Sequence, residues 1–452
     1  MDRKERNCEE DLEKLTKSAR QGKLIGEVAK IKNSSSSSIR GKKLLGWSPF
    51  FNLGELLTAY KSVRKGKKKK EQKIPSYSES NCLDDSELTL LGRYDKNSFW
   101  EILKLYAELN ILKNYKITKY SAFTVPKNNG AGRRTIFSPH PRDRIVFTAV
   151  LNRIREKFSN LDDLNILGLG INGQKDNPHN YFQQIQKDIL RHKWFRKIDI
   201  SNYFPSIDRD MLLNELKNLG IGARELKIIK ESIYCELDIF HKTDRPFFQA
   251  HLKGMGIPQG CAYSPLIANQ YFSDIDLFLK RRKVDYYRFL DDIIFFADSP
   301  GELQKTFEEI KRRAAKKGLE VKHEKDAHGR TTEAINFLGI EILSEKLTIP
   351  QKSIDKLIRH ISSHCQKELD SQSEKKVRRH LKEIVKGWGD YYALLTPEDF
   401  NKKMGNVNRL IVSCFEKMSN ISSYVTDESL QLGGFEYKTG NNKHSNFKEN
   451  NY

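Results

Sequence analysis

The chain has 452 residues, more than a typical single domain holds, so about two to four domains are expected. Lys and Arg number 80 against 59 Asp and Glu, and the net charge of +21 indicates a polyanionic partner, with nucleic acid the first candidate. Apolar residues make up only 38%, but 24 Phe and 18 Tyr allow a core, which excludes wholesale disorder. No apolar run approaches the ~18 residues that span a bilayer, and the first residues lack the apolar core of a secretory signal. We therefore expect a cytoplasmic protein with no membrane partner.

Residues 1–95 are predicted to form a basic N-terminal extension with flexible segments. Ser34–Ser38 is a serine run that cannot build a core, and Arg64–Lys70 is a dense block of cations. The block is either a solvated flexible loop or an arm that contacts phosphates, because clustered lysines release counterions when they bind a phosphate backbone. The residues alone do not decide between these alternatives.

From residue 96 onward, helical and strand patterns follow one another along the chain. Apolar spacing and capping residues, among them the Ser98–Glu101 capping box, predict helices near 98–112, 142–157, 211–219, 264–279 and 302–317. Strands are predicted at 123–127, 133–137, 194–200, 286–296 (two strands) and 336–342. Residues 351–420 are predicted to be helical and basic, followed by a polar tail at 421–452.

Three aspartates stand in otherwise apolar strands. Asp199 ends the strand at 194–200, and the adjacent Asp291 and Asp292 interrupt the apolar run at 286–296. Burying uncompensated carboxylates is costly, so we expect a hairpin tip that faces a cleft and a cation that neutralises the cluster. Carboxylate oxygens favour Mg²⁺ or Mn²⁺ over zinc. The simpler alternative, an Asp-Asp turn used only for its hairpin geometry, accounts for the pair but not for Asp199.

The order of these segments resembles the palm of reverse transcriptases, and in particular group II intron and retron enzymes. The resemblance is carried, in chain order, by the nucleotide-clamping finger hairpin, motifs A to D, the strand that grips the primer and the thumb, at Phe123–Ile136, Lys197–Ile207, Gly256–Leu266, Phe289–Asp292, Gly318–Lys325, Phe337–Gly339 and Gly387–Tyr392. Motif C departs from the usual pattern because Phe289 replaces a Tyr. The resemblance implies an α+β right-hand polymerase fold, with fingers and a palm of antiparallel sheet backed by helices at 96–345 and a helical basic thumb at 346–420.

The resemblance also implies which residues carry the chemistry. Asp199, Ile200, Asp291 and Asp292 would form the metal site, with two Mg²⁺ ions or Mn²⁺ in their place. One ion would activate the primer 3′ oxygen and the other would stabilise the leaving pyrophosphate. Lys325 matches the lysine that is proposed in this family to protonate the pyrophosphate.

Substrate-binding residues are implied in the fingers and in motif B. Lys127 and Arg134 match the finger cations that hold the triphosphate, and the neighbouring Arg133 leaves this register open by one residue. In motif B, Gln259 and Gly260 precede a helix, and Gly260 would let the backbone approach the templating base pair closely.

Motif A favours a DNA product over an RNA product. RNA-making viral enzymes usually carry a second Asp four or five residues after the first, where this chain has Tyr203 and Phe204. Phe204 falls where reverse transcriptases place an aromatic gate, and its flat apolar ring offers a 2′-hydroxyl neither room nor a hydrogen-bond partner. The rival RNA polymerase pattern in motif B is also missing, since residue 268 is Ala. We therefore expect dNTPs as substrates.

Within the family, the chain is most similar to the bacterial "unknown group" and abortive-infection reverse transcriptases, which serve in defence against phage. This resemblance implies a bacterial cytoplasmic enzyme whose partners are dNTPs, a DNA primer and product, and an RNA template, expected to be a structured noncoding RNA. The alternatives are a maturase-like or retron-type reverse transcriptase, or a non-catalytic RNA-binding protein on the same scaffold. The sequence leaves the oligomeric state open.

Overall fold

The computed structural model describes residues 50–68, 115–127, 132–167, 178–322 and 327–368, and single positions within 102–110 and 381–410. Ser34–Ser38, the Ser98–Glu101 capping box, Lys325 and the predicted tail at 421–452 lie outside the described residues. The chain divides into two compact units, which are described separately. The first unit takes Met1–Leu161 and Asn202–Tyr271, and the second takes Asp162–Ser201 and Phe272–Asn450.

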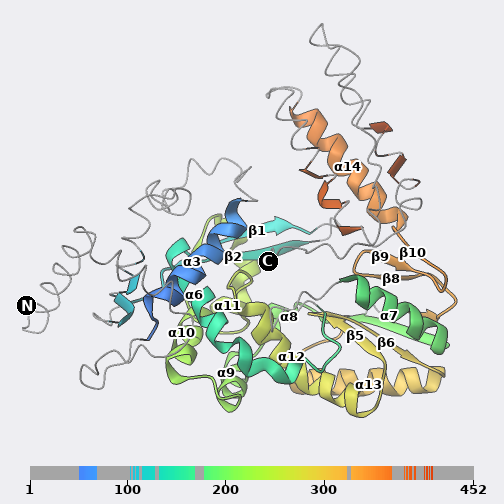
Figure 1. Ribbon diagram of the computed structural model, residues 1–452, viewed down its shortest axis with the longest axis horizontal. Helices are drawn as coiled ribbons and strands as arrows, with labels where there is room; N and C mark the ends of the chain where they lie inside the picture. Colours follow the sequence, from blue (N-terminus) through green and yellow to red (C-terminus); the bar gives the residue numbers. More distant parts are fainter. Residues whose placement is uncertain are drawn as a thin grey trace, which may run out of the picture. The chain divides into compact units, whose positions relative to one another are not determined.

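The first unit combines helices with a three-stranded sheet of order β2-β1-β4 (Figure 1). Strand β1 (Tyr120–Pro126) pairs antiparallel with β2 (Arg133–Ser138) and parallel with β4 (Leu237–Ile239), so the predicted strand pair is confirmed. The α-helices of this unit are α3 (Leu53–Lys68), α6 (Pro141–Ile154), α8 (Tyr203–Ser206), α9 (Arg209–Asn218), α10 (Ala223–Ile233) and α11 (Gln249–Leu252). Two 3₁₀ helices, η1 (Arg155–Leu161) and η2 (Lys242–Phe248), complete it.

Aromatic side chains build the core of the first unit. The ring of Phe147 on α6 meets Tyr120 of β1 at 6.2 Å and Tyr263 at 5.6 Å between centroids, both edge to face. Helix α6, predicted near 142–157, begins at Pro141, which suits the first helical position, and His140 caps the helix by accepting from the Arg142 N–H.

Helix α3 lies within residues 1–95, which are predicted to form a basic extension with flexible segments, yet it packs into the first unit. Phe51 and Leu56 are fully buried, and Glu55 forms an ion pair of 2.7 Å with Arg153 on α6. The side-chain amide of Asn110 donates to the Phe51 carbonyl oxygen at 2.9 Å. The cationic run that begins at Arg64 therefore enters the last turns of a core helix, rather than lying wholly in a loop.

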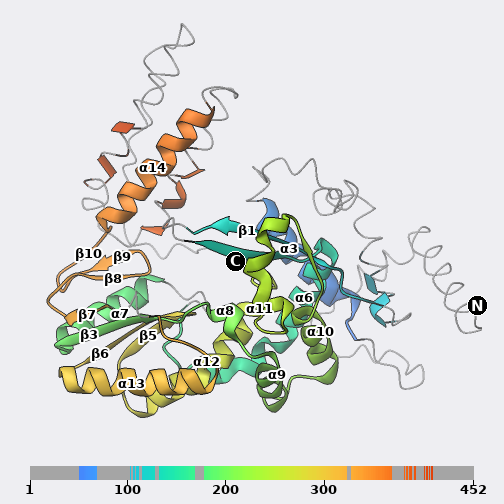
Figure 2. The ribbon, with the colours of Figure 1, turned by 180° about the vertical axis from the view of Figure 1, so that it is seen from behind.

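The second unit is built on a four-stranded antiparallel sheet of order β5-β6-β3-β7. These strands are β3 (Trp194–Asp199), β5 (Tyr286–Phe289), β6 (Asp292–Ala297) and β7 (Ala327–Arg330). Helices α7 (Pro178–Arg191) and α13 (Pro300–Lys316) lie on opposite faces of this sheet (Figures 1 and 2). Helix α12 (Ser264–Arg281) begins in the first unit and continues into the second.

The two faces of this sheet are covered by different elements because side chains alternate along each strand. On one face, Arg196 of β3 reaches α13, where its guanidinium lies 3.3 Å from the centre of the Phe307 ring. On the other face, Phe195 packs in a cluster with Phe182 and Ile185 of α7. The same face carries Asp199 at the end of the strand, where the apolar cover gives way to carboxylates.

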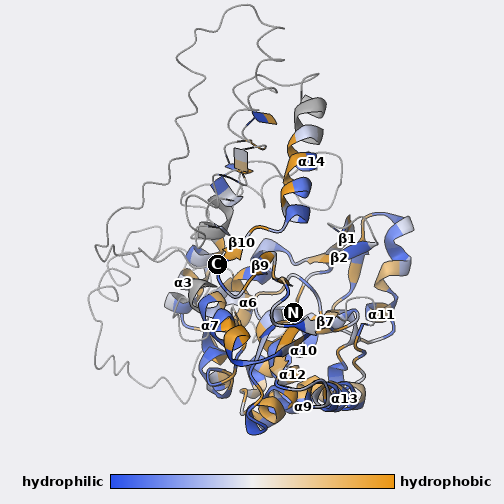
Figure 3. Ribbon diagram, turned by 90° about the vertical axis from the view of Figure 1, so that its right-hand side faces the viewer, coloured by the Kyte–Doolittle hydropathy of each residue, from blue (hydrophilic) through white to orange (hydrophobic). Residues whose placement is uncertain are grey.

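A second small sheet leads into the thumb segment. It has the order β10-β9-β8, with β8 (Ile335–Phe337), β9 (Ile340–Ile342) and β10 (Leu347–Thr348), and α14 (Gln351–Glu368) follows. The single strand predicted at 336–342 is wrong, because the chain reverses at Leu338 and Gly339, both with positive φ. Helix α14 is amphipathic (Figure 3), and its Ile354, Leu357 and Ile361 are buried.

Together the two units confirm the predicted α+β class, with an antiparallel sheet backed by helices at the predicted palm. Among the residues that the structure describes, no helix combines the length and apolarity that crossing a bilayer requires.

Candidate active site

The strand pairing of the second unit brings the three aspartates together. Asp199, the last residue of β3, stands directly opposite Asp292, the first residue of β6. The Ile200 N–H donates to the Asp291 carbonyl oxygen at 3.1 Å. Residues directly opposite one another in an antiparallel pair have side chains on the same face, so Asp199 and Asp292 share one face of the sheet. The backbone thus gathers the four residues of the predicted metal site.

The tip of the β5–β6 hairpin is a two-residue turn. Phe289 pairs with Asp292, and Leu290 between them has a φ of 54°. The predicted hairpin around Asp291 and Asp292 is therefore confirmed. Asp291 lies in the turn and Asp292 opens the next strand, so the two neighbouring carboxylates occupy different positions of the hairpin.

Asp199 is 4% exposed, whereas Asp291 and Asp292 are half-buried. A cation that the sequence analysis does not single out lies beside them. The Lys197 Nζ is 4.0 Å from an Asp292 carboxylate oxygen and donates to the Asn336 carbonyl oxygen at 3.2 Å. Lys197 precedes Asp199 by two residues, so strand alternation places both on one face and is the signal that could have identified it.

The chemistry of these donors fits a hard divalent cation, because the site offers carboxylate and backbone carbonyl oxygens. In the described part of the chain, however, no three His, Cys, Asp or Glu side chains are grouped so that they could hold a metal ion. The proximity of Asp199, Ile200, Asp291 and Asp292 is thus a property of the backbone pairing, not of a preformed cage of side chains.

The segment predicted as motif D adjoins the end of β3. Ile200 forms an isolated antiparallel bridge with Val321, flanked by hydrogen bonds from Ser201 N–H to the Glu320 carbonyl and from Lys322 N–H to the Asp199 carbonyl. The backbones of the predicted motifs A and D are therefore hydrogen-bonded directly to each other. Lys325, the candidate proton donor, lies outside the described residues.

In the first unit, the two arginines of the finger hairpin point to opposite faces. Arg133 pairs with Pro126 and Arg134 with Val125, and successive residues of a strand alternate. The Arg133 side chain donates to the Thr124 hydroxyl and carbonyl oxygens. It also lies 3.8 Å from the buried Asp244. Arg133 is thus engaged within the unit.

Arg134 is exposed and lies on the other face of the hairpin. Lys127 follows β1 directly, and its N–H donates to the Gly132 carbonyl oxygen at 2.9 Å, which continues the pairing by one position. The strand alternation extended to Lys127 puts it on the face of Val125 and Arg134. Of the three candidate phosphate ligands, the hairpin therefore pairs Lys127 with Arg134 and separates Arg133.

Motif B is attached to strand β2. The Phe137 N–H donates to the Gln259 carbonyl oxygen at 3.0 Å. A Cβ on Gly260 would lie 1.8 Å from the Phe137 carbonyl oxygen, so no other residue fits there without displacing the backbone. Gly260 was expected to permit an approach to the templating base pair. The approach that its missing side chain permits in this structure is to β2.

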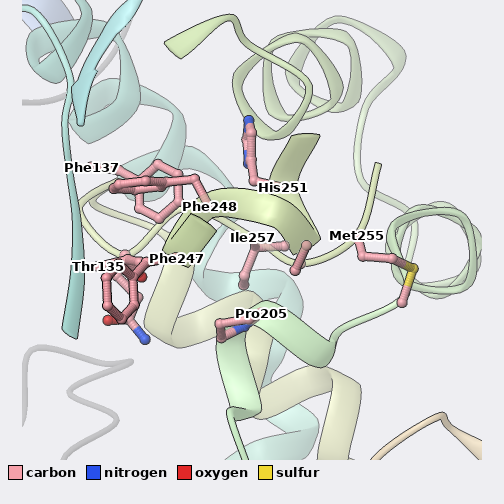
Figure 4. Close-up of a pocket in the computed structure, with 11 residues that line it drawn as sticks. Thr135, Phe137, Pro205, Phe247, Phe248, His251, Met255 and Ile257 are labelled. Atoms are coloured by element: carbon pink, nitrogen blue, oxygen red, sulfur yellow. The ribbon is translucent and has the colours of Figure 1, made fainter. Parts of the chain in front are cut away.

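Gln259 and Phe137 also line a small pocket of the first unit (Figure 4). In the pocket, Phe137 meets Phe248 edge to face at 5.3 Å, and Pro205 and Ile257 lie on its other side. Pro205 follows the predicted gate residue, so the pocket joins β2, motif A and motif B within one unit.

Phe204, the predicted gate, is half-buried on the short helix α8. Its ring lies 5.8 Å from that of Tyr203, edge to face. The Tyr203 hydroxyl donates to the Ala268 carbonyl oxygen on α12, and the Phe204 carbonyl oxygen accepts from the Ile257 N–H at 2.9 Å. The backbone of the gate is therefore tied to motif B.

Two tyrosines of the predicted thumb reach the turn of the predicted primer-gripping segment. Tyr391 donates its hydroxyl to the Leu338 carbonyl oxygen, and Tyr392 donates to the Gly339 carbonyl oxygen at 2.9 Å. The Trp388 ring lies 5.1 Å from that of Tyr392. The second unit thus connects the thumb to the β8–β9 turn.

The comparison with protein families identifies residues 125–342 by their match to the model "Reverse transcriptase (RNA-dependent DNA polymerase)". This range contains all three aspartates and all the other predicted site residues. It supports the predicted right-hand polymerase fold.

Curated relatives agree with this match. The protein YkfC of Escherichia coli K12 is 23% identical over 193 residues, which cover 40% of this chain and 47% of YkfC. The retron Ec83 reverse transcriptase of Escherichia coli is 21% identical over 211 residues, covering 46% of this chain and 62% of the relative. A putative COX1/OXI3 intron 2 protein of Saccharomyces cerevisiae is 23% identical over 50% of this chain and 24% of its own length. The chain spans less than two thirds of each of these relatives.

Solved structures with some similarity include the telomerase of Candida albicans in complex with a telomeric RNA fragment and the apo telomerase of Candida tropicalis. Their sequences are each 13% identical, with TM-scores of 0.40 and 0.39, over 67% and 71% of this chain and 59% and 68% of theirs. The family match therefore makes residues 125–342 similar to the reverse transcriptase (RNA-dependent DNA polymerase) domain.

Proposed function

We propose that the protein is an RNA-directed DNA polymerase, which adds dNTPs to a DNA 3′ end on an RNA template. The observation that carries the proposal is the register of β3 and β6, which sets Asp199 opposite Asp292 beside the Ile200–Asp291 hydrogen bond. Metal binding is the simplest explanation for three carboxylates at one end of a sheet, because their mutual repulsion is costly without a cation.

The metal site is proposed at Asp199, Ile200, Asp291 and Asp292. Two Mg²⁺ ions bound there would polarise the attacking primer oxygen and neutralise charge on the leaving pyrophosphate. The backbone already holds these residues side by side, so an ion needs only side-chain rotations to recruit its ligands. A bound cation would repel the Lys197 ammonium and compete with it for the Asp292 carboxylate. We therefore expect metal binding to weaken the Lys197–Asp292 ion pair.

For the triphosphate we propose Lys127 together with Arg134, since the hairpin puts these two on one face and Arg134 is exposed. A guanidinium binds phosphate oxygens through two parallel N–H groups, and an ammonium adds a point charge. Phe204 is proposed as the gate that rejects a 2′-hydroxyl, and Lys325 remains the predicted proton donor to pyrophosphate.

The decisive experiment is primer extension on a primed RNA template with dNTPs and Mg²⁺. Asp292→Asn should lower kcat/KM by about a thousandfold or more, because it removes a charged metal ligand worth several kcal/mol to the transition state. Asp163→Asn is the matched control, since that carboxylate belongs to the same unit but is 83% exposed in a surface ion pair. Equal extension by Asp292→Asn and Asp163→Asn would disprove the proposed metal site, and a wild-type protein that prefers NTPs would disprove DNA synthesis.

Metal binding can be measured without turnover. Titration of Mg²⁺ or Mn²⁺ should raise the melting temperature of the wild-type protein, because a ligand that binds only the folded state stabilises it. The same titration should leave Asp292→Asn unaffected.

A role in anti-phage defence with a structured noncoding RNA is proposed on the resemblance alone. Expression with the native flanking DNA should lower phage plating, and the Asp292→Asn variant should not. A retron-type enzyme is the second candidate, because a retron reverse transcriptase is among the relatives matched. Sequencing the RNA and DNA that copurify with the protein separates these readings by identifying the template and the product.

A further inference from the structure

Arg209 is a buried cation that the proposed chemistry does not use. It is the first residue of α9, is 3% exposed, and directs its guanidinium at one short stretch of chain that leads into motif B and includes its first residue. Its Nε donates to the Gly256 carbonyl oxygen at 2.7 Å. Its Nη2 donates to the carbonyl oxygens of Met255 at 2.9 Å and His251 at 3.2 Å. One planar guanidinium thus binds three backbone carbonyl oxygens. The ammonium of a lysine could not reproduce this geometry.

The same guanidinium fixes the protonation of His251. Arginine nitrogens only donate, so the His251 Nδ1 at 2.7 Å from Nη2 must accept. The proton of the neutral ring is then on Nε2, which donates to the Cys235 carbonyl oxygen at 3.0 Å. Burial, and to a smaller extent the charge of Arg209, lower the pKa of His251 to about 4 despite the hydrogen bond to Cys235, so the ring is neutral at physiological pH. Arg209 and His251 therefore form one fully assigned network.

The stretch that Arg209 holds is pressed against the proposed gate. The Gly256 N–H donates to the Ile207 carbonyl oxygen at 2.8 Å, and the Ile257 N–H donates to the Phe204 carbonyl oxygen at 2.9 Å. Gly256 has a φ of 74°, and a Cβ there would lie 2.6 Å from the Pro205 Cα. No space separates the two backbones, so a displacement of residues 255–257 displaces residues 204 and 205.

We propose that Arg209 is a positioning residue for sugar selection: by holding the backbone of Met255 and Gly256 against Phe204 and Pro205, it fixes the depth of the aromatic gate. Arg209 acts through these backbone contacts and touches no substrate. The inference rests on the proposed function, since a gate has meaning only in a polymerase. Its physical basis is that a gate discriminates by excluding a single oxygen atom, so a shift well under 1 Å changes the selection.

Two glycines of the same stretch provide a matched test. Gly254 and Gly256 have φ values of 83° and 74°, so alanine is strained at both. A Cβ at Gly254 meets nothing within 4 Å, whereas a Cβ at Gly256 meets the backbone beside the gate. Gly254→Ala therefore reports the cost of strain alone, and Gly256→Ala reports strain plus displacement of the gate.

The measurement is the ratio of kcat/KM for a dNTP to that for the matching NTP in primer extension. We expect the ratio to fall about tenfold or more in Gly256→Ala and in Arg209→Lys, through a lower KM for the NTP, because small displacements at a reacting site have effects of this size. Gly254→Ala should keep the wild-type ratio. The inference is overturned if Gly256→Ala and Gly254→Ala give the same ratio.

A second readout does not depend on turnover. Hydrogen exchange at the Ile257 amide, which donates to Phe204, should accelerate in Arg209→Lys and Gly256→Ala but not in Gly254→Ala. Wild-type exchange rates at this amide in both Arg209→Lys and Gly256→Ala would also overturn the inference. Gly256→Ala keeps the test informative if Arg209→Lys folds poorly. Failure of the wild-type protein to extend any primer would instead disprove the proposed polymerase function, so the two failures are distinguishable.

Discussion

Adjacent residues of one strand can serve different purposes, and the finger hairpin illustrates this with two arginines. Both arginines are exposed, but Arg133 turns toward Thr124 and Asp244, while Arg134 turns to the opposite face with Lys127. The sequence could not separate them, because two neighbouring arginines are chemically identical. Only the register with β1 decides which one faces which way, and that register depends on the whole hairpin.

Substitution of the two arginines should therefore have different effects. Arg134→Ala should raise KM for dNTPs about tenfold or more, since a charge-assisted hydrogen bond to phosphate is worth about 1.5–3 kcal/mol. Arg133→Ala should instead lower the free energy of unfolding by about 1–2 kcal/mol, because the buried Asp244 loses its nearby cation and the Thr124 oxygens lose a donor. Steady-state kinetics and urea unfolding of both variants check the assignment. A larger KM effect for Arg133→Ala than for Arg134→Ala would reverse it.

At the scale of elements, the β5–β6 and β8–β9 turns of the second unit show where sequence patterns succeed and fail. Both turns place a leucine at positive φ, Leu290 at 54° and Leu338 at 48°. Turn signals favour Gly, Asn or Asp at such positions. The first turn is predictable because Asp291 and Asp292 break the apolar run. The second interrupts a mainly apolar segment with only Gly339 as a signal, so the segment resembles one strand.

Helix α3 is difficult to predict from the sequence because of the composition of the segments around it. Serine and lysine runs on both sides suggest a flexible extension, yet Phe51, Leu56 and Ala59 are each fully buried. Apolar residues at helical spacing favour a packed helix even beside charged runs when a partner element is available. Here the partner is α6, whose Arg153 forms an ion pair with Glu55 of α3.

Shortening one side chain tests whether α3 belongs to the fold. Leu56→Ala should lower the free energy of unfolding by about 2–5 kcal/mol, the usual cost of removing a fully buried leucine. Lys61→Ala on the exposed side of the same helix is the control, and its effect should stay within about 0.5 kcal/mol. Denaturant unfolding followed by circular dichroism measures both. Equal stabilities would mean that α3 is peripheral after all.

For the whole molecule, segment order was predictable and the contacts between segments were not. Asp199 and Asp292 are far apart in sequence, and their pairing follows from the resemblance because each motif has a fixed place in the family's sheet. Strand alternation relates Lys197 to Asp199, but the contacts of Arg209 join segments that no local pattern relates, since a buried charge looks like any surface charge in a sequence. Such contacts emerge only when strand register and loop paths are known.

The net charge of +21 leads to a prediction about the protein as a whole. Binding to a primed RNA template should weaken steeply with salt, because lysines and arginines that contact phosphates release condensed counterions. For about six to ten phosphate contacts, affinity should fall by roughly 10³–10⁵ between 50 and 200 mM salt. Asp292→Asn is suited to this measurement, since it blocks turnover and leaves the basic residues in place. Fluorescence anisotropy at several KCl concentrations gives the slope, and an affinity that stays nearly constant would show that the positive charge does not contact the nucleic acid.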